Sequence, residues 1–427
     1  MQNKYFMLVN KIKQILSSQF IRNVSWLGSA ELFNRIFRLA TTVTLARTFS
    51  SQDYGLMAVI YTIFEFTNVL SLKGGIGAKI VQTDEQDLKM ICDTSYWLNW
   101  IMCGSIFIVQ CFAAFPIASF YGDDQLVLPL CITALVYLML PLYAVQTALI
   151  ERENRLKIIA LCNTLQSFFI NSITVVLALS GMGIWAIVWA MILPTPVWII
   201  ITWMNHSWRP PKSFKISRWQ EVVIFGRNIL GVELLNKLRM NIDYLIVGKF
   251  LSIKELGIYY FAFNAGSGIT SNVVYAFMAA LFPHICAVRQ NYNQFKDRYL
   301  KNLKMIGIFV ITVATIQTSL APFYVPIIFG QKWTNAIPIL MTICLSVIPL
   351  TFRWASALLL KAVDKTDTML YFDIFYTFIF ASSLLVAVRW GVFGVAVTVL
   401  IIHSIMSLIF SLWAFKSVFA KSISASS

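Results

Sequence analysis

The sequence is poor in charged residues and lacks the residue patterns that bind metals. Only 12% of its 427 residues are charged and 58% are hydrophobic, whereas an average soluble domain is roughly 25% charged. Its three histidines lie far apart, and its seven cysteines are scattered without a Cys-x-x-Cys pair. A soluble enzyme, a metal centre and a disulfide framework are therefore all disfavoured, and no cofactor is expected.

The N-terminus also lacks the features of a cleavable signal. The apolar stretch at 5–9 is too short, and no small-residue cleavage site follows it. Residues 5–20 instead have an amphipathic pattern, with Lys11 and Lys13 on the polar side. This pattern favours an interfacial helix on the membrane surface, with a frayed tail as the alternative.

Apolar runs of about 20 residues recur along the whole chain, and a run of that length crosses a hydrocarbon core of about 30 Å. The sequence therefore predicts an all-α integral membrane protein with twelve transmembrane helices, at 25–46, 54–74, 92–115, 125–149, 157–180, 183–204, 224–248, 255–284, 304–328, 335–360, 368–388 and 391–414. The predicted organisation is an interfacial segment (1–24), an N-lobe of six helices (25–204), a cytoplasmic linker (205–223), a C-lobe of six helices (224–416) and a cytoplasmic tail (417–427).

The basic residues are distributed unevenly between the two predicted sides. With the N-terminus inside, 23 of the 34 Lys and Arg residues fall on inner segments, and five fall on outer segments: Arg47, Lys249, Lys254, Lys332 and Arg389. This bias follows the positive-inside rule and predicts that both termini are cytoplasmic. The net charge of +15 is then explained by topology and attraction to anionic lipids, and no nucleic-acid partner is expected.

An internal repeat relates the two halves at an offset of 202 residues. Glu-Leu-Phe-Asn-Arg at 31–35 matches Glu-Leu-Leu-Asn-Lys at 233–237, and residues 46–56 match 248–258. Each half holds six predicted spans, an even number, so both halves insert in the same orientation. A pseudo-twofold axis along the membrane normal is expected to relate the two lobes, as in two-lobed transporters.

The second part of the repeat contains elements that we interpret as structural. In both copies a Ser-x-x-Asp/Glu pattern predicts a capping box, which opens the second span at Ser50 and Asp53 and the eighth at Ser252 and Glu255. A glycine follows each box, at positions 55 and 257, and is expected to allow close approach between helices.

The first part of the repeat places charges at membrane depth. The first span carries Glu31, Asn34, Arg35 and Arg38, whose spacing of i, i+3, i+4 and i+7 puts them on one helical face. Such groups are costly in a membrane and are expected to face the bundle interior or a water-filled cavity.

The seventh span repeats the polar face with Glu233, Asn236 and Lys237. Asp243 lies further along that face, and Arg239 lies beside it. Arg353 in the tenth span adds another cation, and the second and eleventh spans add the carboxylates of Glu65 and Asp373.

Two interpretations of these charges are open. Glu31 with Arg35, and Glu233 with Lys237, are i,i+4 pairs that could neutralise each other within the bundle. Alternatively, the surplus of cations faces a central cavity between the lobes, and such a cavity suits an anion such as a phosphate or diphosphate.

The motif of the first repeat is Leu45-Ala46-Arg47-x-Phe49-Ser50-x-x-Asp53-Tyr54-Gly55-Leu56. With this stretch after a polar first helix, and its repeat in the seventh span, the chain resembles the Wzx-type polysaccharide and O-antigen flippases. These form part of the multidrug/oligosaccharidyl-lipid/polysaccharide exporter superfamily. The resemblance covers essentially the whole chain.

The resemblance implies a non-enzymatic transporter of a bacterial inner membrane. It would move an undecaprenyl-diphosphate-linked oligosaccharide to the outer leaflet by alternating access, for export of O-antigen, lipopolysaccharide or exopolysaccharide. Basic cavity residues would hold the diphosphate, a proton or sodium gradient could drive turnover, and a polysaccharide polymerase and assembly proteins are possible partners.

Residue roles are assigned from depth and helical face in this sequence. The substrate-binding candidates are Arg35, Arg38, Lys237, Arg239 and Arg353, with Asn34 and Asn236 as polar cavity wall. The ion-coupling candidates are Glu31, Glu233 and Asp243.

Two other functions remain open. A multidrug antiporter of the same superfamily predicts a binding site dominated by acidic residues. An integral-membrane glycan transferase or polymerase predicts a catalytic outer loop or an intramembrane catalytic His/Asp pair. No predicted outer connection is longer than about a dozen residues, and neither catalytic feature is evident.

Overall fold

The computed structural model describes residues 37–71 and 73–419. These residues form helices joined by short connections, and none of them lies in a β-strand. A helix satisfies its backbone hydrogen bonds internally, which a chain of this hydropathy requires inside a membrane. The predicted all-α fold class is confirmed.

The chain forms two compact units. Unit 1 contains residues 37–48 and Ile60–Lys237, and unit 2 contains Phe49–Val59 and the residues from Leu238 onward. The first of the three boundaries, after Thr48, lies just before α3 (Ser51–Leu70). The other two fall inside α3 and α12 (Trp219–Phe250), so each of these helices contributes to both units. The division of the chain at a 205–223 linker stays a prediction.

Unit 1 is built around a short central helix. Besides its parts of α3 and α12 it contains α4 (Lys73–Gln82), α5 (Glu85–Tyr121), α6 (Val127–Thr133), α7 (Leu135–Met139), α8 (Pro141–Arg152), α9 (Leu156–Leu179), α10 (Trp185–Ile192) and α11 (Pro196–Asn205). The central helix, α8, packs against α4, α5, α9 and α11 and is buried over most of its length. A bend of 49° separates it from the helices before it, and Pro141 is its first residue, where a proline is tolerated.

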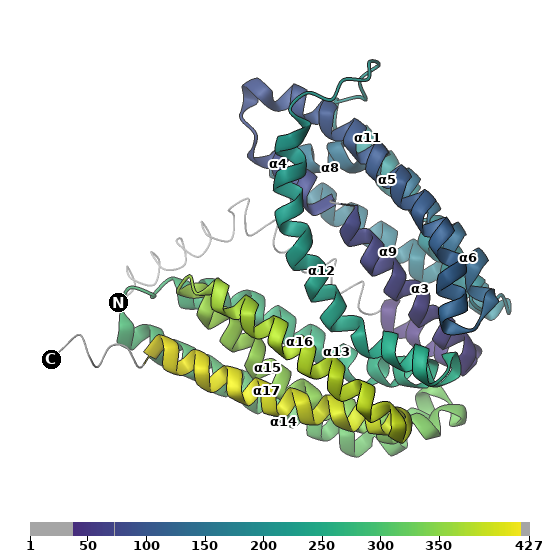
Figure 1. The fold of residues 1–427 in the computed structure, drawn as a ribbon, viewed down its shortest axis with the longest axis vertical. Helices are drawn as coiled ribbons and strands as arrows, with labels where there is room; N and C mark the ends of the chain where they lie inside the picture. The colour runs from purple at the N-terminus through teal and green to yellow at the C-terminus, as the bar shows by residue number, and fades with distance from the viewer. Residues whose placement is uncertain (1–36, 72, 420–427) are drawn as a thin grey trace, which may run out of the picture. The chain divides into compact units, whose positions relative to one another are not determined.

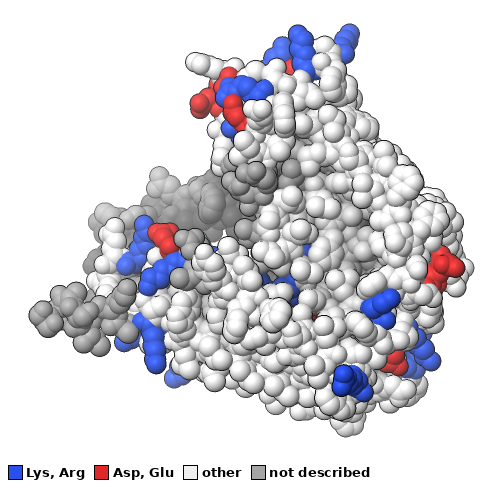
Figure 2. Space-filling view, in the orientation of Figure 1, with Lys and Arg blue, Asp and Glu red and all other residues white. Residues whose placement is uncertain are grey.

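The surface of unit 1 along α5 is apolar. Ile108, Val109, Phe112 and Phe115 are each more than half exposed. Figure 2 shows charged side chains gathered toward the ends of the helices on this face, with a broad uncharged surface along α5 between them. An exposed apolar face of this extent is unfavourable in water and is suited to lipid.

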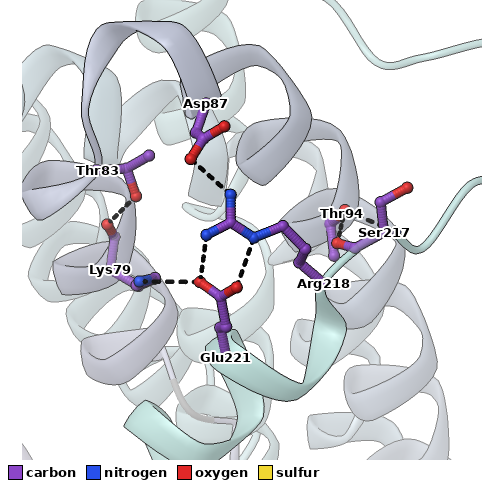
Figure 3. Close-up of polar contacts among 7 residues, drawn as sticks. All are labelled: Lys79, Thr83, Asp87, Thr94, Ser217, Arg218 and Glu221. Carbon is purple, nitrogen blue, oxygen red and sulfur yellow. Dashed lines mark hydrogen bonds and ion pairs between the residues drawn. The ribbon is translucent and has the colours of Figure 1, made fainter.

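Ion pairs fix the start of α12 within unit 1. Arg218 donates to the carboxylates of Asp87 on α5 and Glu221 on α12, and its Nη2 lies 2.9 Å from Glu221 Oε2 (Figure 3). Lys79 Nζ on α4 lies 3.6 Å from the same Glu221 oxygen. The hydrogen bond from Arg218 holds the pKa of the Glu221 carboxyl below its ordinary value. This cluster therefore connects α4, α5 and α12.

Unit 2 is also arranged around one central helix. Its helices after α12 are α13 (Ile253–Cys286), α14 (Tyr292–Tyr324), α15 (Ile337–Ala362), α16 (Thr366–Ala387) and α17 (Gly391–Phe419). The central helix, α15, packs against α13, α14 and α17 (Figure 1). Its buried residues recur along its whole length. The polar side chains of Ser346, Thr351, Arg353 and Ser356 on α15 are therefore held within the interior of unit 2.

The two copies of the repeat pack against each other in unit 2. A Cβ on Gly55 would lie 1.9 Å from the carbonyl oxygen of Ile253, and a Cβ on Gly257 would lie 1.8 Å from the carbonyl oxygen of Ser51. At the offset of 202 residues, Gly55 corresponds to Gly257 and Ser51 to Ile253, so the two contacts are equivalent. The predicted close approach at both glycines is confirmed.

The predicted capping box is confirmed in full at Ser50 and Asp53, and its serine cap is confirmed at Ser252. The amide of Asp53 donates to Ser50 Oγ at 3.1 Å, and Asp53 Oδ2 accepts from the amide of Ser50 at 2.9 Å. In the second copy the amide of Glu255 donates to Ser252 Oγ, also at 3.1 Å. These bonds satisfy N–H groups that the first turn of each helix leaves without a helical partner.

Hydropathy recovers most of the predicted spans. Among the described residues, seven helical stretches are long and apolar enough to cross a membrane, or nine if each of two bent pairs counts as one span. These stretches cover the second to sixth and the eighth to twelfth predicted spans. The eleventh and twelfth predicted spans lie together in the single stretch Met369–Phe419. The seventh span is α12, which is too polar to qualify, and most of the first lies outside the described residues. The number twelve stays a prediction.

Candidate functional site

A cavity of about 730 Å³ lies in unit 1 between α3, α4, α8 and α12. Small side chains on α4 and α8 make room for it, at Gly77, Ala78, Ala144 and Ala148. Its polar lining comes from Asn68, Gln82, Thr147, Glu151, Glu233, Asn236 and Lys237. Amide and hydroxyl groups both donate and accept hydrogen bonds, so this wall suits a ligand rich in hydroxyl groups.

The α12 residues of this cavity are those that the repeat singled out. Glu233, Asn236 and Lys237 lie on one face of the helix, as their spacing predicts, and all three line the cavity. Lys237 Nζ lies 3.1 Å from Glu65 Oε2 on α3, with side chains that are 35% and 44% exposed. An ion pair this exposed adds little to stability. Its main effect is to balance the charge of Lys237 at the cavity wall.

A different arrangement of charges lies in unit 2, where two arginines share one carboxylate. Asp373 Oδ2 on α16 lies 2.8 Å from Arg239 Nη1 on α12. Asp373 Oδ1 accepts a hydrogen bond from Arg353 Nη2 on α15. The Arg353 side chain is 7% exposed, and those of Arg239 and Asp373 are each 17% exposed. We call these three residues the arginine cluster.

Aromatic rings enclose the deeper arginine. The Arg353 guanidinium lies 4.7 Å from the ring centroid of Tyr376 and 5.8 Å from that of Phe410. The Tyr376 hydroxyl is hydrogen-bonded to His403 Nδ1, and the His403 ring stacks on Phe380 with centroids 5.1 Å apart. Cation–π contacts favour the charged guanidinium but carry no negative charge. The cluster therefore holds two guanidiniums at one carboxylate, with aromatic rings over the deeper of the two.

Asp243 lies one helical turn beyond Arg239 on α12. Its carboxylate accepts hydrogen bonds from the Tyr259 hydroxyl at 2.7 Å and from the amide of Tyr244 at 3.0 Å. Both donors are neutral, and Asp243 is buried. A buried carboxylate inside an apolar bundle is costly and is a functional candidate by default. The assignment of Asp243 to ion coupling stays a prediction.

Comparison with known families identifies the protein. A family model described as polysaccharide biosynthesis protein matches residues 44–338, well over half of the chain. The chain belongs to this polysaccharide biosynthesis protein family. The resemblance deduced from the repeat motif is thus confirmed.

Relatives of this polysaccharide biosynthesis protein are similar over most of their length. Teichuronic acid biosynthesis protein TuaB of Bacillus subtilis (strain 168) is 24% identical over 416 residues, covering 96% of this chain and 85% of TuaB. Lipopolysaccharide biosynthesis protein WzxC of Escherichia coli (strain K12) is 23% identical, covering 92% of this chain and 80% of WzxC. Succinoglycan biosynthesis transport protein ExoT of Rhizobium meliloti (strain 1021) is 22% identical, covering 82% and 74%.

Solved structures show the same fold. A multidrug resistance MATE family transporter of the MOP superfamily has a TM-score of 0.77 at 14% identity, covering 91% of this chain and 95% of that protein. The lipid II flippase MurJ has a TM-score of 0.71 at 16% identity, covering 92% and 89%. At this identity the likeness shows the fold alone. This member of the polysaccharide biosynthesis protein family therefore has a membrane-transporter fold.

The structure places the described candidate residues in two groups. Glu233, Asn236 and Lys237 line the cavity of unit 1, whereas Arg239 and Arg353 meet at Asp373 in unit 2. Arg38 is exposed on the helix at 37–48, and Asp243 is bound to Tyr259. The remaining candidates, Glu31, Asn34 and Arg35, lie outside the described residues.

Several residues of these sites had no assigned role from the sequence. Thr147 and Glu151 are spaced i,i+4 on α8, but nothing in the sequence connects them with Asn68 on α3 or Gln82 on α4. Glu65 and Asp373 had a usable signal, because a carboxylate inside an apolar span needs a partner. That signal does not say which cation is the partner.

Proposed function

We propose that this protein flips an oligosaccharide linked to a polyprenyl diphosphate across a bacterial inner membrane, from the cytoplasmic to the outer leaflet. Its family, and relatives named for the biosynthesis of teichuronic acid, lipopolysaccharide and succinoglycan, support this cargo class. The transporter fold that it shares with a lipid II flippase supports the reaction. Movement by alternating access requires no covalent chemistry.

The observation that carries this proposal is the arginine cluster. Arg239 and Arg353 bring two guanidiniums to one carboxylate inside apolar helices, where charged groups are costly and mark functional sites by default. A transporter of cationic drugs needs the opposite sign of charge. The diphosphate of a polyprenyl carrier is an anion that arginine binds well.

The parts of the cargo are assigned to residues by their chemistry. Arg35, Arg38, Lys237, Arg239 and Arg353 are the cationic set for the diphosphate, with Asn34 and Asn236 beside them. The sugars, which are rich in hydroxyl groups, fit the polar cavity of unit 1, and the polyprenyl tail stays in lipid. Glu31, Glu233 and Asp243 are the candidates for coupling to protons or sodium ions. Both termini face the cytoplasm in this scheme.

Charge reversal at two exposed cations tests the proposal in cells. Arg38→Glu and Lys237→Glu variants are expected to lose export of the surface polysaccharide while reaching normal levels in the membrane. Thr42→Glu is the control, because it adds a carboxylate one turn from Arg38 on the same helix without removing a cation. Its export should exceed that of Arg38→Glu. Normal export by both charge-reversal variants at normal expression would show that these cations do not hold the cargo.

A further inference from the structure

The connection between α11 and α12, residues 206–218, is folded along the first turns of α5, and we call it the α11–α12 loop. Trp97 Nε1 on α5 donates to the carbonyl oxygen of Ser213 at 3.0 Å. Thr94 Oγ1, closer to the start of α5, donates to the carbonyl oxygen of Ser217 at 2.9 Å and accepts from its amide at 3.2 Å (Figure 3). The ion pairs at the start of α12 then hold the end of the loop. The loop is therefore attached to α5 at three levels.

The contact at Trp97 lies where α5 enters the apolar part of its span. Asp93 is the last charged residue of α5, and no charged residue follows it before the helix ends at Tyr121. Trp97 lies one turn beyond Asp93. It shares a helical face with Ile101 and Ile108, which are both exposed. Tryptophan at this level is typical of the membrane interface, so the part of the loop that contacts Trp97 lies at the level of the lipid headgroups.

The loop presents an aromatic ring and two lysines at this level. Phe214 packs against Trp97 in a T-shaped arrangement, with ring centroids 5.1 Å apart, and is still 62% exposed. Lys212 and Lys215 flank this ring and are exposed as well. Among the described residues neither lysine makes an ion pair, whereas Arg218 is bound by two carboxylates. The loop contains no acidic residue, and in Figure 2 basic side chains project at the end of unit 1 where Figure 1 shows this loop.

We propose that residues 212–215 form a binding site for an anionic phospholipid of the surrounding membrane. Phe214 lies at the boundary between the headgroups and the acyl chains, and Lys212 and Lys215 bind the phosphate. The exposed face of α5 beyond Trp97 is the apolar surface along which an acyl chain lies. This site goes beyond the proposed function, because it does not depend on which cargo the protein moves.

Depth favours a lipid over an acidic protein segment as the anionic partner. Phospholipid is already present at the level of Trp97, whereas a protein segment would have to enter the headgroup region to reach the same lysines. Lysines close to a membrane surface are attracted to anionic headgroups, and zwitterionic headgroups carry no net charge to attract them. Because the loop leads directly into α12, a bound lipid also restrains the start of that helix.

Hydrogen exchange of a peptide covering residues 209–217 tests the site in the full-length protein. The Ser217 amide, which is bonded to Thr94, reports on the attachment of the loop to α5. The protein is placed in nanodiscs of phosphatidylcholine with increasing fractions of phosphatidylglycerol, which should slow exchange in the unaltered protein. Lys212→Gln or Lys215→Gln should raise the half-saturating fraction of phosphatidylglycerol about fivefold. The double variant should lose the response.

Lys301→Gln combined with Lys304→Gln is the matched control. It removes two exposed lysines from α14 in unit 2, so the net charge falls by the same amount while the loop is unaltered. Its loop should respond to phosphatidylglycerol as the loop of the unaltered protein does. Loss of the response in this control would attribute the effect to net charge and overturn the inference.

Three other results would also overturn it. An equal response in the unaltered protein and in the Lys212→Gln, Lys215→Gln double variant would show that these lysines do not bind the headgroup. Equal exchange in phosphatidylcholine alone and with phosphatidylglycerol added would show that only the ring contacts lipid. Protection by soluble polyglutamate in phosphatidylcholine nanodiscs, equal to that by phosphatidylglycerol, would identify an acidic polypeptide as the partner.

Discussion

Gly55 and Gly257 hold equivalent positions in the two repeats, and each lies against the backbone of the helix that carries the other. Their hypothetical Cβ atoms would meet the carbonyl oxygens of Ile253 and Ser51 at 1.9 and 1.8 Å. The shared distance and the shared offset indicate a local twofold relationship between the starts of α3 and α13. The duplicated motif is therefore a self-complementary packing element.

Alanine at either glycine should destabilise the protein. The clash at each position is with backbone atoms of the neighbouring helix, which cannot move aside as a flexible side chain can. Overpacking of this kind costs about 1–3 kcal/mol or more. Thermal unfolding of purified Gly55→Ala and Gly257→Ala proteins should show lower midpoints of similar size. Gly104 on α5 has open space around it, so Gly104→Ala should unfold at an unchanged or higher temperature. Equal midpoints in all three variants would contradict the packing role.

Acid should loosen the start of α12. The pKa of Glu221 is below its ordinary value of 4.5 because Arg218 donates to its carboxylate. A lowered folded-state pKa means that this contribution is present above pH 4.5 and is lost as the pH falls through the folded-state value. Hydrogen exchange of a peptide covering residues 219–224, corrected for intrinsic pH effects, should accelerate below that range. Glu221→Gln should remove this pH dependence. Unchanged protection of the unaltered protein down to pH 3 would argue against the ion pair.

Exchanging the charges of Lys237 and Glu65 should rescue a single reversal. Lys237→Glu removes the cation and places a carboxylate near Glu65 and on the same helical face as Glu233, so export should fall while the protein still reaches the membrane at normal levels. Adding Glu65→Lys restores one cation and one anion at 3.1 Å or a similar separation. Export should recover at least partly in the double variant, while stability changes by only about 0.2–1 kcal/mol because the pair is exposed. If the double variant exports as little as Lys237→Glu, export requires a cation at position 237 itself, and an ion pair of either orientation between the two positions is not enough.

Local features of the fold were predictable from the sequence. The capping boxes and both close glycines depend on residues a few positions apart, and the repeat shows them twice. The polar face of α12 was predictable for the same reason, since Glu233, Asn236 and Lys237 follow helical periodicity. Because these three residues share one face of α12, they line the same cavity in the structure.

Partners across helices were not predictable. The sequence offered Glu233 as the i,i+4 partner of Lys237, yet Lys237 pairs with Glu65, 172 positions away. The meeting of Arg239, Arg353 and Asp373 depends on the depth and rotation of three separate helices. Periodicity determines the face that a helix presents, but it does not determine which helix lies opposite. For the same reason the cavity formed by α3, α4, α8 and α12 had no sequence signature.

The most direct test of the account is leaflet transfer in vesicles. Full-length protein is reconstituted into liposomes with a fluorescent prenyl-diphosphate-linked oligosaccharide, and the fraction that an added membrane-impermeant quencher can reach is followed over time. The unaltered protein should move the labelled lipid between leaflets, and Arg239→Glu should leave it at the rate of protein-free vesicles. Equal transfer by both proteins, or transfer of a cationic dye in place of the diphosphate lipid, would contradict an anionic cargo held by buried arginine.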